Sequence, residues 1–343
     1  MQPMQPEVGP RRLPRRQVLI VVAAIAVLAL VIAALALVAG PRQVAVATER
    51  TGDPGLATRL TELAEPGHHR LSTFLIEDGR VTYAGLGMDE HSEVEIGSLT
   101  KTFTAEILAN QIEAGRVSAG TTVGEIIDAG DAPVGDVTLA ELADHTSGLP
   151  RLGGTNWLGG VLSGFTGANP YAGISRQDVI DAALAAELSG RGEWEYSNLG
   201  PALLGQLLAI EAGTTYEQLL SGQILEPLGM TETYLMTPGS VPADAPRGLY
   251  SGEKEAEPWE MEGYLPAGGL RSTAADMARY ATHLLDHGLP GHAWMEQEDG
   301  MIEHTGGTYG FSSILVLDPA SGRAVFTAGD TGTRVGDLSR ALL

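Results

Sequence analysis

Apolar and polar positions divide the chain into a short polar N-terminus, one uninterrupted apolar run and a long region of mixed character. Residues 1–17 are polar and rich in Pro and Arg, whereas residues 18–39 include no charged or polar side chain. As a helix rising 1.5 Å per residue, this run would be about 33 Å long, which matches the hydrocarbon core of a bilayer. Arginines directly before such a run favour a cytoplasmic N-terminus and an exported remainder. We therefore predict a cytoplasmic tail at 1–17, a single-pass membrane anchor at 18–40, a tether at 41–55 and an extracytoplasmic remainder.

A cleaved signal peptide is the alternative interpretation of the apolar run. The apolar part of a signal peptide normally has about 7–15 residues. This run is longer, although Ala34-Leu35-Ala36 resembles a cleavage site. The length favours an uncleaved anchor, and a buried core helix is disfavoured because nothing polar interrupts the run.

Beyond residue 55, helical and strand patterns alternate. Strand patterns flank Asp78-Gly79, which predicts a β-hairpin, and they return near the C-terminus at 311–317 and 323–328. Strands at both ends enclosing a helix-rich middle predict one sheet assembled from the two ends of this region. The predicted helices begin near Leu56, Ser98, Thr138, Ser175, Pro201, Thr214 and Thr273.

Specific residues mark two of these helix boundaries. Pro201 suits the first position of a helix that runs to about Glu211. Thr214 and Glu217 have the spacing of a cap for the next helix, which we expect to end before Pro227.

The segment 95–101 contains a serine and a lysine three residues apart, where an extended pattern gives way to a helical one. Residues three apart on a helix project from the same face, so the Ser98 hydroxyl should lie near the Lys101 amine. A neighbouring base activates a hydroxyl as a nucleophile by taking its proton during the attack. The free N–H groups at a helix start also favour developing negative charge. Ser98 is therefore a candidate nucleophile.

The Ser-x-x-Lys spacing alone is weak evidence, since a chain this long contains roughly one such pair by chance. Ser251 and Lys254 form a second pair, in a stretch with acidic residues and prolines and no helical period. We do not take this second pair as a site. The first pair needs support from other motifs.

Composition narrows the classes of function. The chain has 343 residues and a formal net charge of −22, which disfavours nucleic acid as a partner because phosphate binding needs clustered Lys and Arg. It contains no cysteine, which excludes disulfides, thiol nucleophiles and Cys-ligated zinc. The length allows one large domain or two smaller ones.

Further motifs accompany Ser98 in a recognisable order. Together with Tyr196-Ser197-Asn198 and His304-Thr305-Gly306, the Ser98 motif resembles the family of class C β-lactamases, low-molecular-weight penicillin-binding proteins, D-aminopeptidases and related serine esterases. The resemblance extends from about Leu56 to the C-terminus. Other family-typical stretches are His145-Thr-Ser-Gly-Leu-Pro150, Pro227-Leu-Gly-Met230, Ala267-Gly-Gly-Leu270 and His304-Thr-Gly-Gly307.

This resemblance implies an α/β (α+β) fold in two lobes. One lobe, residues 56–97 and 265–343, would hold an antiparallel sheet flanked by terminal helices. The other, residues 98–264, would be helical, with Ser98 in the cleft between them. The loops 151–173 and 237–263, the second with Trp259, are expected to line this cleft and to determine substrate specificity.

The resemblance also implies the roles of the site residues. Ser98 would form an acyl-enzyme, and Lys101 and Tyr196 would share the proton transfers; which of them takes the first proton is left open. Asn198 would hold Lys101 or a substrate amide. The N–H groups of Ser98 and Gly307, next to Gly306, would form the oxyanion hole. No metal or organic cofactor is implied.

His304 departs from the β-lactamase pattern, in which a lysine usually occupies this position. A lysine suits a substrate carboxylate, whereas histidine is mostly neutral near pH 7. As a substrate contact, His304 therefore favours the esterase and peptidase branches, with β-lactamase or penicillin-binding carboxypeptidase as the alternative. The substrate would be a small molecule or a peptide, with fragments of the cell wall among the candidates. His145 is expected to be structural.

Other classes of protein are less well supported. His283, Asp286, His287 and His292 cluster as zinc ligands can, but no His-Glu-x-x-His motif is present and the helix ends there. An α/β-hydrolase is disfavoured because there is no Gly-x-Ser-x-Gly motif. The main rival is a non-catalytic envelope protein that binds peptidoglycan or a partner. Nothing in the sequence indicates the oligomeric state.

Overall fold

The computed structural model describes residues 44–153, 163–164 and 166–343. The predicted cytoplasmic tail, the membrane anchor and the first residues of the tether lie outside these ranges. Within them, no helix has both the length and the apolar character needed to cross a membrane.

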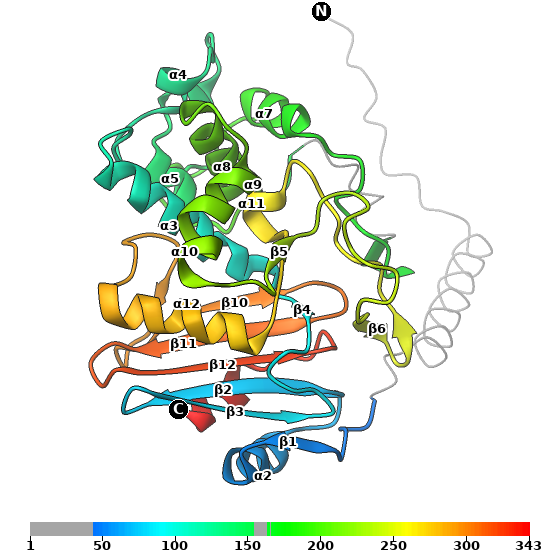
Figure 1. The fold of residues 1–343 in the computed structure, drawn as a ribbon. Helices are drawn as coiled ribbons and strands as arrows, with labels where there is room; N and C mark the ends of the chain where they lie inside the picture. Colours follow the sequence, from blue (N-terminus) through cyan, green and yellow to red (C-terminus); the bar gives the residue numbers. More distant parts are fainter. Residues whose placement is uncertain (1–43, 154–162, 165) are drawn as a thin grey trace, which may run out of the picture. The chain divides into compact units, whose positions relative to one another are not determined.

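A seven-stranded antiparallel sheet joins the two ends of the described chain (Figure 1). Its order is β1-β3-β2-β12-β11-β10-β9. The N-terminal and C-terminal strands meet where β2 pairs with β12 and Phe74 lies opposite Phe326, so the predicted assembly of one sheet from the two ends is confirmed. The strands are β1 (Arg50–Gly52), β2 (Leu71–Glu77), β3 (Arg80–Leu86), β9 (Met295–Glu296), β10 (Ile302–Gly307), β11 (Ser312–Asp318) and β12 (Arg323–Gly329).

Helices cover both faces of this sheet. The helices α2 (Pro54–Leu63) and α13 (Gly336–Leu342) pack on one face, and α12 (Ala274–His287) packs on the other. Along β2, Leu75 belongs to the core under α2 and α13, whereas Phe74 belongs to the core under α12. A strand buried on both faces needs apolar residues at successive positions, which explains the consecutive Phe74, Leu75 and Ile76 of β2.

The predicted hairpin at Asp78-Gly79 connects β2 to β3. Both residues have positive φ, 51° and 70°. A two-residue hairpin turn whose twist matches that of the strands requires positive φ at both positions, and Asp-Gly adopts it readily.

The remaining helices lie between β4 (Val94–Glu95) and β8 (Leu270–Ser272) in sequence. They surround α8 (Leu199–Glu211), which is buried from Leu199 to Ala209. A helix that is apolar on all sides needs neighbours on all sides, and α3, α4, α5, α7, α9 and α11 contact it. These neighbours are α3 (Thr100–Glu113), α4 (Val123–Ile126), α5 (Leu139–Ala143), α7 (Arg176–Leu184), α9 (Tyr216–Leu220) and α11 (Leu265–Gly268).

Two small sheets complete the described structure. The strands β4 (Val94–Glu95), β8 (Leu270–Ser272) and β5 (Tyr234–Leu235) form one of them. The other is a hairpin of β6 (Leu249–Ser251) and β7 (Lys254–Glu255) within the predicted loop 237–263. The second Ser-x-x-Lys pair therefore lies in a hairpin and not on a helix face.

The predicted start of α8 and the cap of the next helix are both displaced. α8 begins at Leu199, two residues before Pro201. Its C-terminal end is closed by the Thr214 N–H, which donates to the Ala209 carbonyl at 3.0 Å. Because Thr214 belongs to this helix end, the cap of α9 moves to Thr215, with Gln218 instead of Glu217 completing the capping box.

The predicted helix end before Pro227 is wrong. α9 continues through a π-helical turn, Ser221–Leu225, into α10 (Glu226–Leu228). Pro227 is the second residue of α10, directly after the π-helical turn. The helix ends instead at Gly229, whose left-handed φ of 65° is typical of a glycine C-cap.

The pairing of Phe74 with Phe326 generates a stability prediction. The two rings are fully buried and stacked with centroids 5.8 Å apart. Replacing Phe326→Ala should lower the free energy of unfolding by about 3–5 kcal/mol, because a cavity remains in a closely packed core. Urea denaturation followed by circular dichroism measures this loss. The exposed Val81→Ala serves as control and should change it by about 0.5 kcal/mol or less; an equally small effect of Phe326→Ala would contradict the prediction.

Candidate active site

Ser98 lies in a short turn that connects β4 directly to α3. The 3₁₀ turn Gly97–Leu99 leads straight into that helix. Gly97 has a φ of +50°, and a Cβ added there would lie 2.6 Å from the Gly307 nitrogen of β10. Only glycine therefore allows the turn to sit against β10. The Thr100 hydroxyl donates to the Gly97 carbonyl at 2.7 Å and stabilises the turn.

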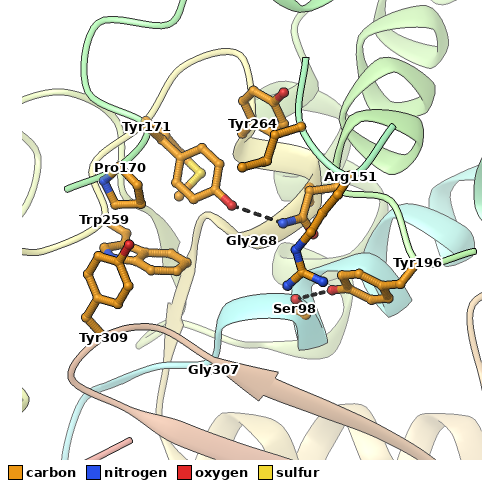
Figure 2. A pocket seen from close by; sticks show the side chains of 14 residues that line it. Ser98, Arg151, Pro170, Tyr171, Tyr196, Trp259, Tyr264, Gly268, Gly307 and Tyr309 are labelled. Atoms are coloured by element: carbon orange, nitrogen blue, oxygen red, sulfur yellow. Dashed lines mark hydrogen bonds between the residues drawn. The ribbon is translucent and has the colours of Figure 1, made fainter. Parts of the chain in front are cut away.

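The hydroxyl of Ser98, the amine of Lys101 and the phenol of Tyr196 converge, as the sequence predicted. The Tyr196 Oη lies 2.6 Å from the Ser98 Oγ (Figure 2). The Lys101 Nζ lies 3.0 Å from the same Oγ and donates to the Ala267 carbonyl at 2.6 Å. Tyr196 is 98 residues away in sequence, so the contact depends on the packing of the segment before α8 against α3.

Burial and mutual charge shift the proton equilibria of this pair. Lys101 is only 1% exposed, and desolvation lowers its pKa below the ordinary value of a lysine. Burial alone would raise the pKa of Tyr196, but the charge and hydrogen bonding of Lys101, the hydrogen bond with Ser98 and the charge of Arg151 together outweigh it and lower this pKa. Both shifts bring the groups closer to the neutral range in which a general base is effective.

β10 approaches the Ser98 turn so closely that side chains are excluded there. A Cβ on Gly306 would lie 1.8 Å from the Ile96 carbonyl oxygen. The Ser313 hydroxyl of the neighbouring strand also donates to this oxygen, at 3.0 Å. Ser98 and Gly307 consequently line the same cavity. This is the arrangement that an oxyanion hole formed by their two N–H groups requires.

Asn198 stands at the start of α8, two residues after Tyr196, and lines the same cavity. Its Nδ2 donates to the Tyr171 Oη at 3.0 Å. Its Oδ1 is buried and has no hydrogen-bond partner among the residues that the structure describes. Of the two contacts expected for Asn198, the one with Lys101 does not form among the described residues. The orphaned oxygen instead suits an N–H donor of a bound molecule.

Aromatic side chains form the wall of the cavity beyond Asn198 (Figure 2). The cavity has a volume of about 570 Å³. Ring centroids of Tyr171 and Trp259 are 5.2 Å apart, those of Tyr171 and Tyr264 are 4.9 Å apart, and those of Trp259 and Tyr309 are 5.2 Å apart. Tyr171 and Trp259 come from the two loops expected to determine specificity. An apolar wall of this size accommodates an apolar or aromatic group.

A cluster of charged side chains around Arg271 holds the segment that carries Trp259. Arg271 of β8 is fully buried, and its guanidinium lies 3.3 Å from the Glu93 carboxylate and 3.7 Å from that of Glu95. Glu95 in turn accepts the Trp259 backbone N–H at 3.4 Å. The strand that leads into the Ser98 turn therefore also positions the Trp259 segment.

His304 lies outside the Ser98 cavity, although we expected it to contact the substrate. It lines a second cavity of about 350 Å³ on the other side of Tyr196. Its Nδ1 donates to the Thr305 carbonyl at 2.8 Å. Burial, assisted by the charge of Lys101, lowers the pKa of His304 to about 3. His304 is therefore neutral and supplies no charge to the cavity that contains Ser98.

His145 supports the segment that carries Tyr196. It adopts a positive φ of 59°, and its Nδ1 accepts the Ser197 N–H at 3.3 Å. Its ring lies 4.7 Å from the Tyr196 ring, centroid to centroid. Burial lowers the pKa of His145 to about 4, so it remains an acceptor at neutral pH. These contacts agree with the structural role expected for His145.

The histidines near the end of α12 do not form one cluster. His283 pairs with Glu106 at 3.2 Å, whereas His292 pairs with Asp144 at 2.7 Å. The described residues contain no group of three or more ligating side chains that could hold a metal ion. The zinc alternative therefore gains no support from this region.

The sequence analysis missed two residues of the aromatic wall, Tyr264 and Tyr309, which lie outside the predicted loops. It placed Arg151 in the loop 151–173 without giving it a role, and the guanidinium carbon of Arg151 lies 5.0 Å from the centre of the Tyr196 ring. One signal was available: Arg151 directly follows the family-typical stretch that ends at Pro150, and Tyr309 follows the stretch that ends at Gly307.

Comparisons with known proteins agree with this geometry. A protein-family model described as Beta-lactamase matches residues 57–299. The D-alanyl-D-alanine-carboxypeptidase/endopeptidase AmpH of Escherichia coli (strain K12) is 28% identical over 280 residues, covering 68% of this chain and 70% of that protein. Penicillin-binding protein 4 of Amycolatopsis lactamdurans is 25% identical over 251 residues, covering 69% of this chain and 60% of that protein.

A solved structure shows the same fold. The class C β-lactamase from Rhodobacter sphaeroides superposes with a TM-score of 0.68 and covers 84% of this chain and 97% of that one. The sequence identity is 17%, so this similarity concerns the fold alone.

The close approach at Gly306 generates a testable prediction. Gly306→Ala should push β10 away from the Ser98 turn and displace the Gly307 N–H, and loss of one such donor typically costs about 10²- to 10³-fold in rate. Steady-state hydrolysis of an activated ester measures the effect. Gly222→Ala is the matched control, because a Cβ there meets nothing within 4 Å. Equal activities of the two variants would contradict the prediction.

Proposed function

The chain belongs to the β-lactamase family of serine hydrolases, and we propose that it cleaves an ester, amide or peptide through an acyl-enzyme on Ser98. The observation that carries this proposal is the convergence of Ser98, Lys101 and Tyr196 at the cavity lined by Gly307.

The reaction proceeds in two acyl transfers. The Lys101–Tyr196 pair takes the Ser98 proton as the Oγ bonds to the substrate carbonyl carbon. The N–H groups of Ser98 and Gly307 stabilise the oxyanion. The carbonyl bond to the leaving group then breaks, and the pair returns the proton to the departing oxygen or nitrogen. Water, activated by the same pair, hydrolyses the ester and restores Ser98.

The energetic cost of burying the Lys101 amine favours an enzyme over a non-catalytic binding protein. Lys101 is buried without a carboxylate among the groups that shift its pKa. Removing an ammonium group from water without an ion pair is costly, so a buried unpaired lysine is a poor device for stability. A lysine whose pKa is lowered beside a nucleophile is useful for proton transfer. The non-catalytic envelope protein remains the alternative that the labelling experiment below tests.

The substrate class follows from the cavity and the relatives. The aromatic wall favours an apolar acyl group, and the orphaned Asn198 oxygen suits a substrate N–H. We favour an esterase or a D-amino-acid peptidase. A penicillin-binding carboxypeptidase or β-lactamase is the second candidate, because AmpH is named a D-alanyl-D-alanine carboxypeptidase and endopeptidase.

We also propose that the enzyme is anchored in the cell membrane by residues 18–40, with its hydrolase region outside the cytoplasm. The support is the uninterrupted apolar run and the arginines that precede it. An extracytoplasmic site fits small-molecule or peptide substrates, including those derived from the cell wall.

Covalent labelling tests the proposed function. Intact mass spectrometry after exposure to a fluorophosphonate should show one adduct, which Ser98→Ala abolishes. A parallel exposure to a penicillin separates the two candidates: an adduct from the fluorophosphonate alone supports an esterase or peptidase, and a penicilloyl adduct supports the second candidate. Absence of both adducts in the folded protein would support the binding protein.

The pH dependence of acylation should reflect the Lys101–Tyr196 pair. Free lysine and tyrosine have pKa values of about 10, and the pKa of each group is lowered here. Because the base acts only after losing a proton, kcat/KM should rise with pH along a limb whose midpoint lies below about pH 10. Hydrolysis of a p-nitrophenyl ester, corrected for spontaneous hydrolysis, measures the limb. Tyr196→Phe should lower kcat by about 10²- to 10⁴-fold; a midpoint at or above pH 10 would contradict the shifted pair.

A further inference from the structure

Apart from the effect of its charge on the pKa of Tyr196, Arg151 has no role in the proposed chemistry, although it lines the cavity. Its guanidinium lies beside the hydrogen bond between Ser98 and Tyr196 (Figure 2), with its central carbon 5.0 Å from the centre of the Tyr196 ring. The side chain is exposed, so its N–H groups can reach a bound molecule. An arginine offers up to five such donors in a planar fork.

The backbone holds Arg151 in this position. Its carbonyl accepts the Asn198 N–H at 2.9 Å, and the Pro150 carbonyl accepts the Ser197 hydroxyl at 2.8 Å. The backbones of Pro150 and Arg151 are thus tied to the segment that carries Tyr196. These hydrogen bonds fix the Arg151 backbone, and the contact of its guanidinium with the Tyr196 ring restricts the side chain, which together reduce the entropy lost when a ligand binds.

The charge of Arg151 is not neutralised within the described structure. Among the described residues that line the Ser98 cavity, Arg151 has the one permanently charged side chain. No carboxylate of the described residues forms an ion pair with it, and the sequence from 154 to 165 contains no Asp or Glu. The chain as a whole has a net charge of −22. An unpaired cation gives this cavity a local charge opposite in sign to that of the whole protein.

We propose that Arg151 binds a carboxylate on the leaving group of the substrate and thereby determines specificity. This inference rests on the proposed function. An arginine holds a carboxylate through two parallel hydrogen bonds, which provide both affinity and orientation. Arg151 would supply the charge that His304, neutral and outside this cavity, does not.

The placement of the carboxylate follows from the proton transfers. The pair that includes Tyr196 returns a proton to the leaving group, so the leaving group must lie next to the Tyr196 phenol. Arg151 stacks on the same ring and therefore faces this side of the scissile bond. Trp259 and Tyr309 lie on the side of the cavity opposite Arg151 (Figure 2). The acyl group would occupy this aromatic side. The substrate is then an apolar or aromatic acyl group joined to an anionic leaving group, as in a peptide with a free C-terminal carboxylate.

A purely structural role for Arg151 is the competing explanation. A cation over the Tyr196 ring stabilises the packing of that ring and favours its phenolate form. Such a role would affect all substrates equally and would displace the pH profile of acylation. Recognition of a carboxylate would instead discriminate between substrates that differ only in that group.

Two matched phosphonate probes separate these roles. Both are aryl esters of benzylphosphonic acid; the aryl leaving group of one carries a meta-carboxylate and that of the other a meta-carboxamide. The Ser98 Oγ bonds to phosphorus as the bond from phosphorus to the aryl oxygen breaks, and the Ser98 proton passes through the Lys101–Tyr196 pair to the aryl oxide. Intact mass spectrometry of the full-length protein in detergent gives the second-order rate constant of labelling for wild type, Arg151→Gln, Arg151→Lys and the control Arg116→Gln. Arg116 is exposed, and the structure gives it no ion pair within the described ranges.

The expected result is selective. Arg151→Gln should slow labelling by the carboxylate probe about 10- to 100-fold, the range for loss of a charge-assisted hydrogen bond, and change labelling by the carboxamide probe less than about threefold. Arg151→Lys should lie between wild type and Arg151→Gln for the carboxylate probe, and Arg116→Gln should match wild type.

Other outcomes overturn the inference in distinguishable ways. Equal slowing of both probes, together with a displaced pH profile, would assign Arg151 to positioning of Tyr196. Unchanged labelling by both probes would show that Arg151 contacts neither leaving group. Failure of wild type to react with either probe or with a fluorophosphonate would refute the proposed function itself, and with it this inference.

Discussion

The buried amine of Lys101 is the constraint on which the rest of the site depends. It contacts the Ser98 hydroxyl and the Ala267 carbonyl, and no carboxylate offsets its burial. Burial of such a group is less costly where its proton can move to a neighbour, and the Tyr196 phenol is hydrogen-bonded to the same hydroxyl. The three hydrogen-bonded groups are therefore the proton-transfer unit that we propose. Because Lys101 and Tyr196 are coupled, the pKa of this unit is a property of the pair and of neither residue alone.

The fold brings this unit together from three separate parts of the chain. The turn before α3 contributes Ser98 and the first turn of α3 contributes Lys101. The segment before α8 contributes Tyr196, and β10 closes the cavity through glycines that allow its backbone to touch the Ser98 turn. The helical part and the sheet therefore meet at the reacting hydroxyl itself. A change in how β10 packs would be transmitted to the oxyanion donors without passing through any flexible segment.

Charge is distributed unevenly between the two sides of Tyr196. On one side, His304 and His145 are buried and neutral. On the other side, Arg151 keeps its charge beside Ser98. The histidine at position 304, where β-lactamases usually have lysine, favours the esterase and peptidase branches over β-lactam hydrolysis. The structure adds a cation that this comparison does not include, because Arg151, from the loop 151–173, lines the cavity.

Features with a local cause were predictable from the amino-acid sequence. The spacing of Ser98 and Lys101, the Asp78-Gly79 turn and the apolar strands at both ends depend on short-range geometry and burial, so pattern and motif order sufficed to predict them. Tertiary packing set the partner of the Asn198 side chain, the burial of His304 and the position of the Arg151 cation. Each of these depends on contacts between residues far apart in the chain, and periodicity carries no information about which distant surfaces meet. The same reason explains the misplaced helix cap at Thr214: its N–H was already used to close the preceding helix, a competition that a capping motif read in isolation does not reveal.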